Sequence, residues 1–199
     1  MESNYDMTFS NDSRKETFVK WLNILFISQI ANLVTTALGA ITSIGSIISW
    51  VSRIVSIIVI VALFKLAVVH ERYRKAAIFH CISVGGGIIS ALINVNILGI
   101  ALSVCSIIAS YHQLTAHAEI TAPKNAKLSG RWKSLFYCQL VVGLIAGFLS
   151  SAGVVIAVLA DINSESIVSG TLVFITLVNV ILGLFHVMYL KQTLTLFKE

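Results

Sequence analysis

Six apolar stretches alternate with short polar segments along the chain. The stretches cover residues 18–40, 47–69, 76–95, 97–116, 135–160 and 167–190. An α-helix needs about 20 consecutive apolar residues to cross the hydrocarbon core of a bilayer, and each stretch meets that length. We therefore predict an all-α, polytopic integral membrane protein with six transmembrane helices.

Basic residues lie on one side of this predicted topology. They precede the first stretch or lie at its start, separate the second from the third and the fourth from the fifth, and follow the sixth. They are Arg14, Lys15, Lys20, Arg72, Arg74, Lys75, Lys124, Lys127, Arg131, Lys133, Lys191 and Lys198. The opposite connections are short or poor in basic residues. By the positive-inside rule, both the N-terminal tail (1–17) and the C-terminal tail (191–199) are expected in the cytoplasm, together with a basic loop at 117–134.

The six stretches group into three hairpins, 18–69, 76–116 and 135–190. Their first helices carry the related segments LFISQI, IFHCIS and LFYCQL, and their second helices end in ALFKL, ASYHQ and GLFHV. This similarity predicts three parallel two-helix repeats within one transmembrane domain (18–190). The connection at 39–49 is rich in Gly and Ser, so helix, loop and re-entrant turn all stay open there.

The composition agrees with a membrane protein rather than a soluble one. Hydrophobic residues make up 57% of the 199 residues and charged residues 12%, against roughly 25% charged residues in an average soluble domain. The net charge of +5 comes from short segments between apolar stretches, so it indicates topology rather than nucleic-acid binding. The expected partner is the lipid bilayer, in the cytoplasmic membrane; a second copy or another membrane protein is also compatible.

Enzymatic chemistry is not expected. The six stretches contain no acidic residue for acid–base catalysis or for a hard metal ion. His80 and Cys81 are neighbours on a predicted helix, where their side chains diverge by about 100°. Cys105 and Cys138 have no metal-ligand spacing. We therefore predict no catalytic residue, no metal and no cofactor.

Polar residues recur at helical spacing inside the stretches and are the candidates for a substrate or ion path. They are Gln29, Asn32, Lys65, His80, Asn94, His112, Gln139, Asn179 and His186. Lipid cannot hydrogen-bond such groups, so they should face the interior of the bundle. They either join helices by hydrogen bonds or line a wet cavity, and the sequence leaves both interpretations open.

Two smaller groups within this set have specific expectations. Lys65, His112 and His186 occupy matching repeat positions near the cytoplasmic helix ends, where they form a ring of bases for an anion or lipid head group, or extend individually to the head groups. His80 lies deeper and needs a partner from another helix, with Gln29 or Gln139 at matching depth.

Glycines mark expected sites of close helix packing or a kink: Gly85, Gly86, Gly87, Gly143, Gly147 and Gly183. The triple glycine is not a phosphate-binding loop, because it lacks the Walker and G-x-G-x-x-G patterns. Gly87 shares the polar stripe of His80, and Gly85 and Gly86 widen that face, so Gly87→Leu is expected to be more damaging than a lipid-facing Ile→Leu substitution. Residues of the basic segment are expected to contact lipid head groups. They are Lys124, Lys127, Arg131, Trp132 and Lys133.

Two functions follow from these patterns. The first is a transporter or channel-type protein that carries a neutral or anionic small molecule between the hairpins. The second is a non-transporting membrane subunit for interaction, assembly, immunity or sensing, in which the polar stripes only pack.

Overall fold

A computed structural model describes residues 12–39, 45–93, 98–160 and 164–198, with the side chains at 12, 45–47, 91–93, 98, 100, 147, 149–160 and 164–172 left aside. Within these ranges the chain forms six helices and no strand: α1 (Asp12–Gly39), α2 (Gly45–Leu66), α3 (Glu71–Ile93), α4 (Leu98–Thr121), α5 (Ala126–Ala160) and α6 (Ser164–Lys198). The predicted all-α class is confirmed.

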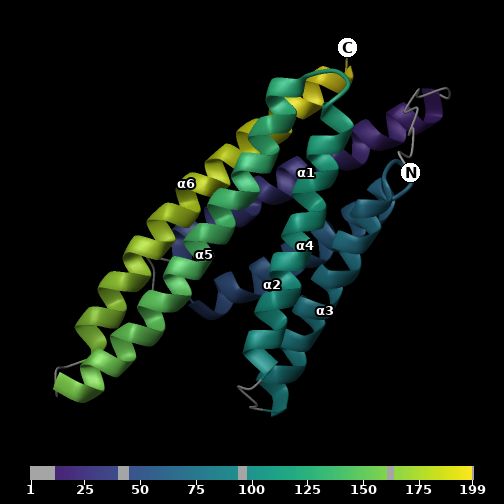
Figure 1. Cartoon of the computed structure of the whole chain (residues 1–199). Coiled ribbons are helices and arrows are strands. Elements are labelled where there is room, and N and C mark those ends of the chain that lie inside the picture. Colours follow the sequence, from purple (N-terminus) through teal and green to yellow (C-terminus); the bar gives the residue numbers. More distant parts are fainter. Residues whose placement is uncertain (1–11, 40–44, 94–97, 161–163, 199) are drawn as a thin grey trace.

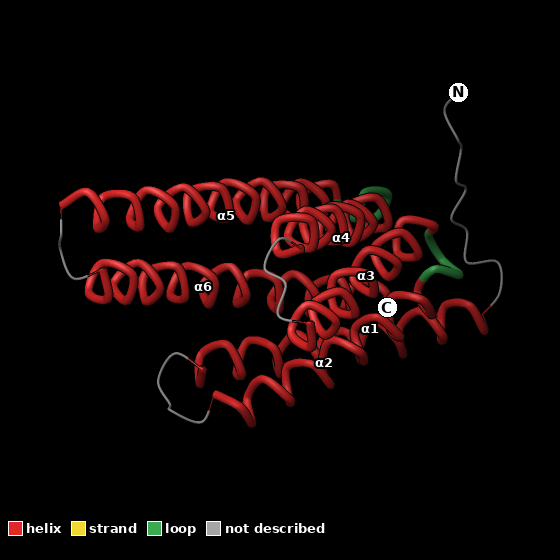
Figure 2. The backbone as a smooth tube through the Cα atoms, turned by 90° about the horizontal axis from the view of Figure 1, so that it is seen from below, coloured by secondary structure: helices red, strands yellow, loops and turns green. Residues whose placement is uncertain are grey.

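The helices form a closed ring. Each helix packs against the next one in the chain, and α6 returns to pack against α1. Within each of the pairs α3–α4 and α5–α6, the two helices run side by side (Figure 1), and α1 and α2 lie together beneath these pairs (Figure 2). The three predicted hairpins are thus neighbouring helix pairs, and the threefold repeat stays a prediction.

The helices extend beyond the apolar stretches at the end of the ring that holds the basic segment. The predicted loop at 117–134 is mostly helical, because α4 continues to Thr121 and α5 begins at Ala126 after a short turn. Asn125 caps α5, where its Oδ1 accepts a hydrogen bond from the Leu128 amide (2.9 Å). The predicted tail at 191–199 is helical up to Lys198. Hydrophobicity alone marks the part of a helix that suits lipid and misses these polar extensions.

The tightly packed core lies at this same end. It joins the start of α1, the end of α2, the start of α3, the end of α4, the start of α5 and the end of α6, with Leu22, Leu66, Tyr73, Trp132 and Leu190 all at 0% exposure. The turn between α4 and α5 lies beside the C-terminal end of α6 (Figure 1), where Lys124 Nζ donates to the Leu196 carbonyl (3.3 Å). This end therefore has a conventional protein interior.

Away from this end the helices expose large apolar side chains. Ile57, Leu144 and Leu177 are each more than half exposed. Three segments of the described chain are long and apolar enough to cross a membrane: Ser13–Gly39, Ile48–Leu66 and Val173–Lys198. Six had been predicted. The predicted stretches at 76–95, 97–116 and 135–160 are described only in part.

Two predicted connections lie outside the described residues. One is the connection at 94–97, which includes the path candidate Asn94. The Gly/Ser-rich connection at 39–49 is described only at its ends. There, α1 ends at Gly39, and the residues from Gly45 onward belong to α2.

Candidate functional site

A polar cavity of about 240 Å³ lies where the six helices face one another. Every helix contributes to its wall; the lining residues are Gln29 and Asn32 of α1, Ser56 and Val59 of α2, His80 of α3, Ser110, Gln113 and Leu114 of α4, Gln139 of α5 and His186 of α6. A cavity reached by all members of a closed ring is central to the bundle. It is the candidate functional site.

The wall of the cavity is polar, and none of its described side chains carries a full charge. It presents amides, hydroxyls and imidazoles. The Nε2 atoms of Gln113 and of His186 are buried and have no hydrogen-bond partner in the protein. A buried polar atom left this way costs about 1–3 kcal/mol, and a polar cavity larger than a water molecule relieves that cost by holding water or a ligand. The cavity is therefore suited to a hydrogen-bonding guest.

Five of the predicted path residues meet in this cavity: Gln29, Asn32, His80, Gln139 and His186. They come from four helices that are distant in sequence. His80 finds its partner on another helix, as expected, but that partner is Gln113 rather than Gln29 or Gln139; the His80 Nε2 to Gln113 Oε1 distance is 3.3 Å. Gln113 was not among the predicted residues. His80 and Gln113 lie at similar distances along the chain from the connection between α3 and α4, and this signal could have placed them at the same depth.

The remaining path candidates with described side chains do not line the cavity. Lys65 and Asn179 are exposed on the outside of the bundle. His112 is half-buried and stacks on Phe79, with ring centroids 6.1 Å apart. Only His186 of the three predicted bases reaches the interior, so Lys65, His112 and His186 do not form a ring. Repeat positions fix height along a helix, but helix rotation decides which side faces inward.

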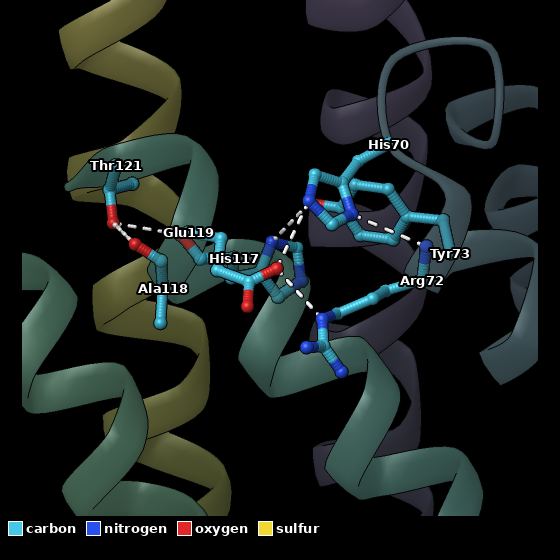
Figure 3. Close-up of polar contacts among 7 residues, drawn as sticks. All are labelled: His70, Arg72, Tyr73, His117, Ala118, Glu119 and Thr121. Carbon is cyan, nitrogen blue, oxygen red and sulfur yellow. Dashed lines mark hydrogen bonds and ion pairs between the residues drawn. The ribbon is translucent and has the colours of Figure 1, made fainter. Parts of the chain in front are cut away.

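A second polar cluster adjoins the cavity through His186. The His117 Nδ1 atom shares a 2.8 Å hydrogen bond with the Tyr73 hydroxyl, and its ring stacks on Trp132 at 4.5 Å (Figure 3 shows His117 and Tyr73). Trp132 also presents its ring to His186 at 5.4 Å, and its Nε1 donates to Thr193 Oγ1 at 3.2 Å. This aromatic layer links α3, α4, α5 and α6 and bounds one side of the cavity.

The position of Trp132 corrects the prediction that it contacts lipid head groups, because it is completely buried. Its basic neighbours Lys124, Lys127 and Lys133 are exposed. Lys124 also lies over the Phe197 ring (4.5 Å), and Arg131 Nη1 donates to Gln192 Oε1 (3.4 Å). Part of the basic segment thus binds α6 rather than only facing outward.

An ionic contact fastens the connection between α2 and α3 to α4. Glu119 Oε2 lies 2.7 Å from Arg72 Nε and 3.0 Å from His70 Nε2 (Figure 3). Burial lowers the pKa of His70, although Glu119 opposes that shift. For Arg72, burial disfavours the charge, but the hydrogen bond and the charge of Glu119 outweigh it and raise its pKa. The contact is therefore strongest between Arg72 and Glu119.

Close helix contacts occur at two of the predicted glycines. A Cβ atom at Gly86 would collide with the Leu102 side chain of α4, and one at Gly183 would lie 2.8 Å from Leu33 Cδ1 of α1. Positions 85, 87 and 143 have open space instead, which corrects the expectation of close helix packing at these three glycines. The packing of Gly147 lies outside the described side chains.

Within the described ranges, no three His, Cys, Asp or Glu side chains gather as a metal-binding group. The free cysteines Cys81, Cys105 and Cys138 are exposed or half-buried. The chemistry on offer in the cavity is thus hydrogen bonding by neutral groups.

Acidification is expected to destabilise the fold through His117. Burial, with a smaller contribution from His186, holds the pKa of His117 well below its usual value near 6.5. As the pH falls below 6.5, the unfolded chain takes up a proton that the folded chain refuses, so stability falls by on the order of 1 kcal/mol per pH unit. Thermal unfolding in detergent between pH 8 and 5 measures this slope.

The matched control is His117→Asn, which keeps a hydrogen-bond acceptor for Tyr73. It should show a shallower slope, while His70 still contributes in the same direction. Equal slopes in the two proteins would contradict the assignment to His117.

Comparisons with protein-family models, curated proteins and solved structures find no match to this chain. Its function must therefore be argued from the cavity itself.

Proposed function

We propose that this chain is a six-span membrane protein that binds a small neutral or anionic molecule in its central cavity and carries it across the bilayer. The observation that supports this proposal is the cavity, to which all six helices contribute polar side chains. The unpartnered Nε2 atom of Gln113, an amide donor, favours a guest with a hydrogen-bond acceptor. The absence of carboxylates among the described lining residues disfavours a cation.

The outward faces support the membrane part of the proposal. Exposing side chains such as Ile57, Leu144 and Leu177 to water costs free energy, whereas contact with the hydrocarbon of a bilayer does not. We place the protein in the cytoplasmic membrane. The end of the bundle that holds the aromatic layer faces the cytoplasm, together with both termini, because the basic residues gather at that end.

Cysteine labelling on α1 tests water access to the cavity. In a background without Cys81, Cys105 and Cys138, Asn32→Cys should react with a hydrophilic methanethiosulfonate reagent roughly tenfold faster or more than Val34→Cys, because only a hydrated thiol ionises readily. Asn32 lines the cavity, whereas Val34, one half-turn away, is exposed on the outer face. Reconstituted vesicles supply the bilayer.

Both other outcomes contradict the proposal in different ways. Rapid labelling of both positions would place the outer face of α1 in water. Labelling of neither would mean a dry, packed interior, as a non-transporting interaction subunit requires. Flux of uncharged solutes and of small anions into the same vesicles, blocked by modification of Asn32→Cys, would measure transport itself.

A further inference from the structure

A groove of about 370 Å³ lies between α4 and α5 and adjoins the central cavity. Its wall combines Ser106 and Ile107 of α4 with Phe136, Leu140, Gly143 and Leu144 of α5. Ser110 and Gln139 line both the groove and the cavity. The two spaces are therefore neighbours, with these two side chains in the wall of each.

The groove lies at the outer face of the bundle. The α5–α6 pair diverges from the α3–α4 pair with distance from the turn that joins α4 to α5 (Figure 1). Gly143 adds space, because a Cβ atom at this position would meet nothing within 4 Å. Leu144 and Ile107 are 62% and 41% exposed, so the rim is apolar and faces the hydrocarbon region of the proposed topology.

The two spaces differ in chemistry. The cavity is polar, and none of its described lining residues is Asp, Glu, Lys or Arg. The Nε2 atoms of Gln113 and His186 are buried without a partner; the first is a donor, and the second donates or accepts according to its tautomer. The groove is mostly apolar and open to the outside. A molecule that fills both must have an uncharged hydrogen-bonding head and a hydrocarbon chain. A charged head is disfavoured, because none of the described lining side chains supplies a counter-charge for a buried ion.

We propose that the ligand is a neutral single-chain amphiphile that enters from the bilayer between α4 and α5. Its head lies in the central cavity and its chain in the α4–α5 groove. This inference rests on the proposed function and specifies its substrate class. It also specifies the route, because the groove lies between α4 and α5 and its rim residue Leu144 is exposed.

The physical chemistry predicts which part of the ligand decides affinity. A hydrocarbon chain gains little by leaving lipid for an apolar groove, since lipid tails are as apolar as leucine. The head gains hydrogen bonds to buried polar atoms that are otherwise unsatisfied. Binding should thus depend on the head and vary little with chain length.

Photolabelling tests the proposal. The protein in phosphatidylcholine nanodiscs is irradiated with a monoacylglycerol, and separately with a long-chain alcohol, each carrying a diazirine in the chain. We expect saturable adducts at Ile107, Leu140 and Leu144, prevented by unlabelled monoacylglycerols of several chain lengths but not by free glycerol. Gly143→Leu should lower saturable labelling roughly tenfold, because its side chain takes up space that the hydrocarbon chain has to occupy while the head lies in the cavity, which is a steric conflict and not a loss of apolar contact. Gly87→Leu, at an equally open position outside the groove, should leave it unchanged.

Three results would overturn the proposal. Unsaturable adducts spread over outward residues such as Ile57 and Ile181 would mean ordinary annular lipid. Competition by free glycerol would mean a water-soluble solute. Failure of both probes to give saturable adducts in the groove would exclude the amphiphile class. None of these results alters the labelling contrast between Asn32→Cys and Val34→Cys, so the proposed function fails or survives separately.

Discussion

Trp132→Ala is expected to destabilise the protein by about 3–5 kcal/mol, the usual cost of truncating a buried tryptophan. The side chain is completely buried and packs on the rings of His117, His186 and Tyr189. Its Nε1 also donates a hydrogen bond to Thr193 Oγ1. Because these partners come from two other helices, the loss should loosen the aromatic layer as a whole. Unfolding in detergent, followed by circular dichroism, measures it.

Phe148→Ala on the same helix is the matched control. Phe148 is 72% exposed, so its truncation should change stability by less than about 0.5 kcal/mol. Trp132→Phe keeps an aromatic ring and loses the hydrogen bond to Thr193, which predicts a smaller loss of about 1 kcal/mol. Equal stability of Trp132→Ala and Phe148→Ala would mean that the layer does not form.

Gly86→Leu is expected to cost about 1–3 kcal/mol, as overpacking between closely packed helices usually does. A side chain at this position would collide with Leu102 of α4. The helices also approach closely nearby, where Ser83 Oγ donates to the Leu102 carbonyl (3.3 Å). Gly87→Leu, which meets open space, should be neutral or slightly stabilising because leucine favours helix more than glycine. Thermal unfolding of both variants gives the comparison.

A compensating substitution sharpens this experiment. Leu102→Ala removes the side chain that the new leucine meets, so the double variant Gly86→Leu/Leu102→Ala should recover part of the loss. Additive effects of the two substitutions would show that positions 86 and 102 do not interact. A larger loss for Gly87→Leu than for Gly86→Leu would contradict the packing of α3 on α4.

The candidate site could be predicted in part. Gln29, Asn32, His80, Gln139 and His186 stand out because amides and imidazoles are rare in apolar stretches and have to face inward. Gln113 was missed because it lies near the end of its stretch, beside His112, where either residue could be at an interface. Which of the two turns inward depends on the rotation of α4, and packing sets that rotation.

The six apolar stretches by themselves determined the helical class, the number of helices and their pairing into hairpins, because each stretch has the length and composition of a helix. They also placed Gln29, Asn32, His80, Gln139 and His186 in the interior, but they wrongly placed Lys65 and Asn179 there and missed Gln113. Only the tertiary structure decided that the ring closes from α6 onto α1, that Trp132 is buried within a helical extension of the basic segment, and that Gly86 rather than Gly87 is the contact. These features depend on how each helix is rotated and on which neighbour it meets, and such contacts join residues far apart in the chain.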